Sequence, residues 1–561
     1  GIYGVQALRT YLDIHPSAKV LALEADDGAG GVWSKHRFYD GFWTQVSFGC
    51  CEFSDRPMKQ PRDEDIRYGL FNARYVHEYL ESYLDDHVYG DQSLRDRVRC
   101  GLQVTSVSKI DGLWHVRGQP TNPRGTDRIF TAPKVIIASG NTSIPNVPDF
   151  PNHGFQGQTI HIKDYGKHAS KLMSSSPKSI AVLGAGKSAA DLAFTAAQSG
   201  HIVSWIVRKS GHGPGLFAVP QKLGPYQNPT DVMLSRLGGT LSPSHLQPYT
   251  WWMWFLHTTW LGQMLLMLIF RIAGENSWKH ARWNSMENAR KGYHLLKPDS
   301  DGFVLDAPVG FIQDPRFWPT IAEKVRVYRE DIDNLGVNGI HLADADKTVI
   351  DCDVLLLGTG FKSQLPFLTE NEHRRLGLSH TVIDDKKAAL WDRLTEEADS
   401  DIVRRFPLLA RRQASGEKQE ATPMRLYNAI GPLDDRSIAF VGFISLVNNF
   451  LGAEWQALWA TAWLDCSPLL KVSGPQRMEK IVAYDTQWSR RRYPYSSEVS
   501  GTTYDLECIP YGDRLMAELG LESHVRHLSW WDYWTSVNCQ RRYAGLVPEY
   551  KANLAAKISS G

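Results

Sequence analysis

Residues 179–209, SIAVLGAGKSAADLAFTAAQSGHIVSWIVRK, decide the fold. The apolar run Ile180–Leu183 ends at Gly184, and beyond the next glycine the apolar period changes from two residues to about 3.6. Gly200 stands where a helix would end, and Val203–Val207 is a second β-rich run. The stretch therefore predicts a βαβ unit with a tight glycine turn between its first strand and its helix.

The turn of this unit reads GxGxxA from Gly184 to Ala189, a spacing that lets the backbone approach a pyrophosphate at the helix N-terminus. A site for NAD would carry an acid after the second strand, but Arg208 and Lys209 stand there and suit a 2′-phosphate. We therefore predict an NADPH site, and an ordinary strand-to-helix turn is the alternative. The predicted contacts are Gly184, Gly186, Lys187, Ser188, Arg208 and Lys209.

Composition narrows the class of protein. A chain of 561 residues with 42% hydrophobic and 22% charged residues predicts two or three globular domains. A formal net charge of +1 offers no field for nucleic acid, so we expect a small-molecule partner. The seven cysteines include no CxxC pair, which argues against a zinc site, a redox dithiol or a disulfide framework and favours a reducing, cytoplasmic compartment. No metal is expected.

The N-terminal residues resemble the later part of a second nucleotide-binding motif. Gly1 and Gly4 suit the last two glycines of GxGxxG, and a helical pattern follows them. The strand Lys19–Leu23 then ends in Glu24, twenty residues after Gly4, where an acid binds ribose hydroxyls. The first strand and first glycine of this motif would precede the chain, so we expect an N-terminally incomplete site. A helix and a strand with a chance Glu are the alternative.

Two nucleotide sites, one ending in Glu24 and one in Arg208 and Lys209, suggest FAD and NADPH. Three further motifs follow in order: GGVW at residues 30–33, a YxGxxTQ segment ending in Gln45, and FxGxxxHxxxY at residues 155–165. With these motifs the sequence resembles the flavin-containing monooxygenase family, the class B flavoprotein monooxygenases, and especially its fungal members, which implies a role in secondary metabolism. Gln45 stands where the family commonly has Asn or Asp, and Gly166 follows the last motif where Lys or Arg is usual.

The resemblance implies roles for individual residues. Gln45 would be the catalytic candidate, touching the oxygenated flavin or the NADP ribose, and His161 would be a hinge residue between domains. Asn448 and Asn449 would either face the flavin or cap the helix that follows them. The cofactor contacts implied outside the NADPH turn are Gly1, Gly4, Glu24, Gly31, Val32, Trp33, Val104, Ser139, Gly140, Thr359 and Gly360.

The predicted fold is α/β with two Rossmann-like dinucleotide-binding domains, the FAD domain being discontinuous. We expect its first part at residues 1–150, the NADPH domain at 151–330 with a helical apolar insertion at 211–298, and the second FAD part with the C-terminal region at 331–561. Leu102–Val107 and Leu113–Val116 suggest a hairpin around the turn signal Asp111–Gly112.

The insertion contains YTWWMWFLHTTWLGQMLLMLIF at residues 249–270. This stretch approaches the length of a membrane span, but His257, two threonines and Gln263 interrupt it. We expect an interfacial or substrate-entrance helix with peripheral membrane contact, and a buried core helix is the alternative. The protein would then be cytoplasmic and membrane-associated at most.

The leading functional hypothesis is an FAD-dependent, NADPH-consuming monooxygenase. The resemblance implies that it uses O2 and a C4a-(hydro)peroxyflavin to insert one oxygen atom into an apolar small molecule, by N- or S-oxygenation or by Baeyer-Villiger chemistry. The alternative is a truncated nucleotide-binding protein that cannot hold FAD. A pyridine-nucleotide disulfide reductase would also use two nucleotide sites, but it needs a CxxC pair that the sequence lacks.

Overall fold

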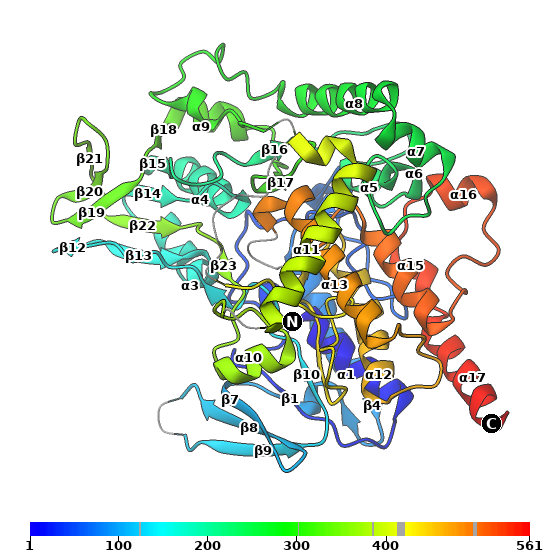
Figure 1. The fold of residues 1–561 in the computed structure, drawn as a ribbon. Coiled ribbons are helices and arrows are strands. Elements are labelled where there is room, and N and C mark those ends of the chain that lie inside the picture. Colours follow the sequence, from blue (N-terminus) through cyan, green and yellow to red (C-terminus); the bar gives the residue numbers. More distant parts are fainter. Residues whose placement is uncertain (123–124, 301, 384–385, 412–420, 497–501, 561) are drawn as a thin grey trace.

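The computed structural model describes residues 1–561 except 123–124, 301, 384–385, 412–420, 497–501 and 561. Its most regular layer is a five-stranded parallel sheet with the order β13-β22-β14-β15-β18 (Figure 1). The strands are β13 (Gln158–His161), β22 (Val354–Leu357), β14 (Ser179–Leu183), β15 (Ile202–Val207) and β18 (Val325–Arg329). The three central strands β22, β14 and β15 read as apolar runs because a parallel sheet is covered on both faces, whereas the edge strands β13 and β18 contain exposed polar residues.

The βαβ unit predicted from residues 179–209 is confirmed. Helix α4 (Lys187–Gln198) joins β14 to β15, and these strands pair in parallel from Ser179–Ile202 to Leu183–Ile206. The buried face of α4 is rich in alanine, which lets the helix lie close to the sheet. Helices α3 (Ile162–Met173) and α9 (Phe317–Lys324) also pack against α4.

The second dinucleotide domain extends further along the chain than predicted. Strand β22 inserts between β13 and β14, pairing in parallel with both, although it lies beyond the expected boundary at residue 330. A small mixed sheet precedes it, made by β19 (Ile332–Gly336), β20 (Gly339–Leu342) and β21 (Val349–Ile350), which pair antiparallel, with β12 (Asn152–His153), which pairs in parallel with β19. The chain therefore returns to the first domain only after Leu357.

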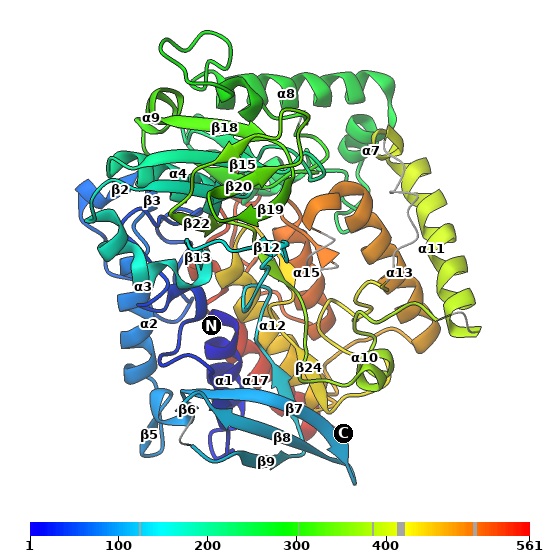
Figure 2. The ribbon, with the colours of Figure 1, turned by 90° about the vertical axis from the view of Figure 1, so that its left-hand side faces the viewer.

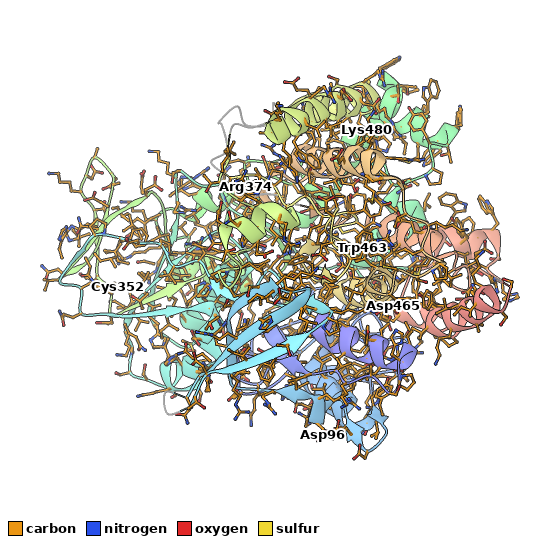
Figure 3. The ribbon with its side chains drawn as sticks, turned by 60° about the horizontal axis from the view of Figure 1, so that its bottom comes forward. Asp96, Cys352, Arg374, Trp463, Asp465 and Lys480 are labelled. Atoms are coloured by element: carbon orange, nitrogen blue, oxygen red, sulfur yellow. The ribbon has the colours of Figure 1, made fainter. Side chains whose placement is uncertain are left out.

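The first domain is assembled from distant parts of the sequence. Helix α1 (Ile2–Ile14) packs along α12 (Asn449–Leu464), and β10 (Val135–Ile137) pairs in parallel with β24 (Ile438–Phe440). Every residue of α12 from Phe450 onward is buried, so this helix is the centre of the largest core. Figure 3 shows Trp463 and Asp465 at its C-terminal end, where Asp465 binds His15 and Lys134, each at 2.6 Å. The discontinuous first domain is confirmed.

The hairpin expected around Asp111–Gly112 is confirmed and is longer than predicted. Strands β7 (Leu102–Ile110), β8 (Leu113–Pro120) and β9 (Arg128–Ala132) form an antiparallel sheet at the bottom of Figure 1. The two turn residues have φ of 50° and 81°, as a two-residue hairpin turn requires. The other short strands of this region are β1 (Ala22–Leu23), β2 (Ile66–Arg67), β3 (Leu70–Phe71), β4 (Val88–Tyr89), β5 (Gln92–Ser93), β6 (Val98–Arg99) and β11 (Ile144–Pro145).

The insertion is helical and lies at the end of the molecule opposite this antiparallel sheet (Figures 1 and 2). It contains β16 (Leu216–Ala218), α5 (Pro229–Met233), α6 (Arg236–Gly239), α7 (Trp251–Thr258) and α8 (Trp260–Trp278). Across the described ranges, no single helix is long and apolar enough to cross a membrane. Helices α7 and α8 pass that test only as a pair, bent by 78°.

Most of the remaining elements cover the first domain, whereas β17 pairs with β16 of the insertion. They are α2 (Arg74–Asp86), β17 (Val309–Phe311), β23 (Phe361–Lys362), α10 (Glu370–Leu376), α11 (Lys386–Arg405), β25 (Ile444–Ser445), α13 (Pro475–Arg492), β26 (Thr502–Thr503), α15 (Cys508–Leu519), α16 (Trp530–Thr535) and α17 (Leu546–Ser559).

Candidate functional site

A cavity of about 1770 Å³ lies between the two dinucleotide-binding folds. Pockets for one small ligand usually have about 300–1,000 Å³, so this cavity has room for more than one. Of the site residues predicted from the sequence, every one except Lys209 lines it. These lining residues are Gly1, Gly4, Glu24, Gly31, Val32, Trp33, Gln45, Val104, Ser139, Gly140, Gly184, Gly186, Lys187, Ser188, Arg208, Thr359 and Gly360.

The first end of the cavity is built around the N-terminus of α1. The Glu24 carboxylate lies 3.7 Å from the nitrogen of Gly1, at the positive end of the helix dipole. Gly31 has a φ of 62°, and a Cβ atom there would lie 2.9 Å from the Cα of Gly1. The absence of side chains at both positions keeps the backbone open where a helix N-terminus can receive an anion.

The other end is built around the N-terminus of α4. Gly184 has a φ of 140°, and a Cβ atom there would lie 2.3 Å from the carbonyl oxygen of Gly358. Gly186 is the N-cap of α4 and supplies no capping side chain, so the first amides of the helix are free to bind an anion. Lys187, the first residue of the helix, forms an ion pair with the buried Asp191 one turn on.

Arg208 and Lys209 diverge at the end of β15. Arg208 lines the cavity, and none of the ion pairs between described residues includes it. Lys209 lies outside the cavity, with a side chain 68% exposed and its Nζ 3.5 Å from Glu330. The two side chains differ because the chain turns after Arg208, where the nitrogen of Gly211 donates to the Arg208 oxygen. Of the predicted cation pair, one member therefore faces the site.

Gln45 holds the cavity wall in place. Its Oε1 accepts a hydrogen bond of 2.7 Å from the backbone nitrogen of Phe311, and its Nε2 donates to the carbonyl oxygen of Thr44 at 3.3 Å. Its backbone oxygen also accepts from Thr230 Oγ1 at 3.1 Å. The amide therefore ties its loop to β17 and to the insertion, and both ends of the side chain are engaged with protein groups.

The FxGxxxHxxxY motif joins the two domains. His161 Nε2 donates to the carbonyl oxygen of Gly360 at 2.9 Å, and its Nδ1 accepts from the Lys163 nitrogen to cap α3. The oxygen of Gly360 also accepts from the nitrogen of Asn146, in the connection out of the first domain. Gly166, the residue that departs from the family pattern, allows close packing, since a Cβ atom there would lie 2.4 Å from the oxygen of His36.

Two cations that sequence reasoning missed also line the cavity, Arg37 and Lys163. Arg37 is nearly buried; it donates to the oxygen of Thr142 at 3.0 Å and lies 3.4 Å from Asp26. Lys163 donates to the oxygen of Ser143 at 2.7 Å, and burial, with nearby Arg37, lowers its pKa. Both occupy unspecified positions between motif residues, so their spacing carried no signal.

The two asparagines at the start of α12 correspond one to each of the alternatives that the sequence left open. Asn448 is fully buried, and its side chain caps α12 by accepting from the nitrogens of Phe450 and Leu451. Asn449 lines the cavity, where its Oδ1 accepts from the Tyr3 hydroxyl at 3.1 Å.

Known proteins with similar sequences indicate the class of protein to which this chain corresponds. A family model described as pyridine nucleotide-disulphide oxidoreductase matches residues 77–230. The FAD-dependent monooxygenase rstn6 of Aspergillus nomiae is 29% identical over 99% of this chain and 98% of its own. The FAD-dependent monooxygenase resA of Aspergillus sclerotiorum is 28% identical over 100% of this chain and 98% of its own.

Solved structures share the fold. A closed structure of cyclohexanone monooxygenase has a TM-score of 0.58 at 16% identity, covering 93% of this chain and 96% of its own. A polycyclic ketone monooxygenase from Thermothelomyces thermophila has a TM-score of 0.55 at 15% identity, covering 99% of this chain and 87% of its own.

Two dinucleotide-binding folds that face one cavity define the class of two-nucleotide oxidoreductases. Within that class, the chain is similar over its whole length to fungal FAD-dependent monooxygenases, and it shares its fold with cyclohexanone monooxygenase. The expectation from the sequence motifs is thereby confirmed. The name of the matching family model reflects the shared fold, because the seven cysteines are free and form no CxxC pair.

Proposed function

We propose that this chain binds FAD at the end of the cavity near α1 and NADPH at the end near α4. The residues at the two ends of the cavity fit these two cofactors. Gly31 and Gly1 approach so closely that a side chain would fill the first cradle, and the free amides at the start of α4 offer a pyrophosphate site. Glu24 would accept from ribose hydroxyls, and Arg208 would bind a 2′-phosphate. The relatives named as FAD-dependent support this assignment.

When bound, the two cofactors would supply the chemistry, which is hydride transfer from NADPH and activation of O2 by the reduced flavin. The chain positions the two groups and excludes water. Gln45 keeps β17 over the start of α4, and a Cβ atom on Gly310 of that strand would lie 2.9 Å from the Cβ of Lys187. His161 fixes the connection between domains through Gly360. Gln45 is accordingly a positioning residue.

The reaction that we propose is insertion of one oxygen atom into an apolar ketone. The lining includes Met233, Leu305 and Leu446, which suit an apolar molecule. Ketone monooxygenases stand among the solved structures that share the fold, which favours Baeyer-Villiger chemistry over oxygenation of a nitrogen or sulfur atom.

Absorbance of the purified protein tests the assignment. We expect a flavin absorbance band at about 450 nm and a rate of NADPH oxidation that rises when ketone is added. Product analysis with parallel panels of ketones, amines and sulfides assigns the reaction type. A colourless protein that gains no band on incubation with FAD would instead support the alternative of a nucleotide-binding protein without flavin.

Arg208→Ala should raise the KM for NADPH about tenfold or more and leave the KM for NADH nearly unchanged, because only the phosphate ester needs the guanidinium. Steady-state NADPH and NADH oxidation measures both constants. Lys209→Ala is the matched control, since Lys209 faces away from the cavity and should change neither KM. Equal effects of Arg208→Ala on the two coenzymes would remove Arg208 from the 2′-phosphate.

We also propose that α8 rests on a lipid surface. Its exposed side includes Trp260, Met264, Leu268 and Ile272, one turn apart, and Trp260 is 73% exposed. The alternative of a buried core helix therefore does not hold for this face. Residues 249–270 contain no Asp, Glu, Lys or Arg. Arg271 follows directly and forms an ion pair with Glu275 at 2.8 Å, and Lys279 and Arg282 come at the C-terminal end of α8 and just beyond it. An apolar face with tryptophan and a basic flank suits the interface of an anionic membrane.

The double variant Trp260→Ser, Leu268→Ser should bind vesicles of phosphatidylcholine and phosphatidylserine about tenfold or more weakly than the parent, because two apolar side chains no longer enter the interface. Co-sedimentation measures the binding. Val337→Ser is the control, since Val337 is 67% exposed on the turn between β19 and β20, away from α8 (Figure 1). Unchanged sedimentation, or a dimer that the double variant dissociates, would contradict lipid contact.

A further inference from the structure

The carboxyl group of Asp505 faces the cavity, and neither of the proposed nucleotide sites uses it. Asp505 lies between β26 and α15 and lines the cavity, together with Ser445 at the end of β25. Strands β25 and β26 pair in parallel, Ile444 with Thr502 and Ser445 with Thr503. This pairing brings Ser445 Oγ within 2.9 Å of Asp505 Oδ1, to which it donates.

The surroundings of Asp505 leave it short of partners. Among the described residues, Ser445 is the one that donates a hydrogen bond to the Asp505 carboxyl group, and Asp505 forms no ion pair with any of them. Burial raises the pKa of Asp505, and the nearby Arg492 opposes that shift. Arg492 itself is fully buried and donates to Ser242 Oγ and to the oxygen of Phe303. Two of its guanidinium nitrogens, Nε and Nη1, are therefore engaged elsewhere, and Nη2 has no hydrogen-bond partner among the described residues.

Among the described residues, Glu507 is a second charged group near Asp505, and it points away from the cavity. Its carboxylate accepts from the Tyr493 hydroxyl at 2.7 Å, and Glu507 does not line the cavity. Leu305, Leu446 and Leu506 give the wall near Asp505 an apolar character. A carboxyl group among apolar side chains loses hydration free energy, and a single hydrogen-bond donor compensates only part of that loss. A second hydrogen-bond donor, from a ligand, would compensate more of it.

We propose that Asp505, held by Ser445, selects apolar substrates that carry an O–H or N–H donor, an inference that rests on the monooxygenase function proposed above. Its free oxygen would accept from a substrate hydroxyl or ammonium group while the apolar body fills the space beside Leu305 and Leu446. The residue would act on substrate choice, and it has no part in holding either nucleotide. It is a specificity determinant at the cavity wall between β25 and α15.

Calorimetric titration tests this role with three rigid apolar probes: 2-adamantanone, 5-hydroxy-2-adamantanone and 1-adamantylamine. The parent protein should bind the hydroxyl or the ammonium probe about tenfold more tightly than 2-adamantanone, as one buried hydrogen bond to a charged group allows. Asp505→Leu should abolish both preferences. Asp505→Asn keeps an acceptor oxygen and should keep the hydroxyl preference while losing the ammonium preference. Asp351→Asn, at an exposed position after β21, is the control and should keep both.

A parent protein without preference for either donor-bearing probe would overturn the proposal, as would an Asp505→Leu variant that keeps the preference. The flavin band and thermal unfolding of each variant establish that it is folded. Because the titration needs no turnover, its outcome is separate from that of the proposed function. A colourless protein with the Asp505 preference would refute the flavin assignment alone, and a yellow protein without it would refute this inference alone.

Discussion

Gly184→Ala is expected to abolish NADPH oxidation, with at least about a hundredfold loss of kcat/KM. A methyl group would stand 2.3 Å from the carbonyl oxygen of Gly358, and the φ of 140° is a conformation that side chains rarely adopt. The turn has little room to move. The nitrogen of Gly184 donates to Ile206, and its oxygen accepts from the Trp205 indole at 2.8 Å.

Gly200→Ala is the matched control for this substitution. Gly200 belongs to the same βαβ unit and has a φ of 85°, but a Cβ atom there meets nothing within 4 Å. Backbone strain alone should lower stability by roughly 1 kcal/mol and leave the KM for NADPH unchanged. If both variants oxidise NADPH at the parent rate while retaining the flavin band, the turn at Gly184 is not the NADPH site.

Glu454→Gln is expected to stabilise the protein relative to the parent at alkaline pH. Glu454 lies in α12, where one carboxyl oxygen accepts from the Ser54 nitrogen at 2.8 Å and from its hydroxyl at 2.7 Å. Burial raises the pKa of Glu454 to about 8, with the neighbouring Asp55 adding to the shift and Arg9 opposing it. A glutamine oxygen can accept the same two hydrogen bonds without becoming charged.

The sign follows from proton linkage. The folded state holds the Glu454 proton up to about pH 8, whereas the unfolded chain releases it near 4.5. The stabilising contribution of the protonated group is therefore complete below pH 4.5 and is lost as the pH rises to about 8. Over that window the parent should lose on the order of 4 kcal/mol relative to the variant.

Denaturant unfolding of the parent and Glu454→Gln at several pH values across this window measures the difference. Other titrating groups are common to both proteins and cancel in the comparison. Glu323→Gln, on the exposed side of α9, should show no pH-dependent difference. A difference between parent and Glu454→Gln that stays constant with pH would show that Glu454 has an ordinary pKa in the folded protein.

Local sequence patterns were sufficient for the elements whose chemistry is local. The βαβ unit at residues 179–209 and the hairpin around Asp111 follow from the apolar period and from glycine positions, which adjacent residues determine. The domain boundary at residue 330 was wrong, because β22 pairs with β14 across more than 150 residues and its apolar run fits any buried strand.

Within the candidate site, motif residues could be predicted because nucleotide binding needs glycine and charge at fixed spacings, as at Gly184 and Glu24. Arg37 and Asp505 could not, since each reaches the cavity through loop and strand packing that no spacing encodes. The tertiary structure also distinguished Arg208, which faces the cavity, from Lys209, which pairs with Glu330.

The sequence by itself determined the class of fold and the presence of two glycine-rich helix N-termini, because glycine conformation and apolar period are properties of short stretches. Only the tertiary structure decided which side chains meet across the cavity, which engage one another and which remain for a ligand. Those outcomes depend on contacts between residues hundreds of positions apart, such as Gln45 with Phe311.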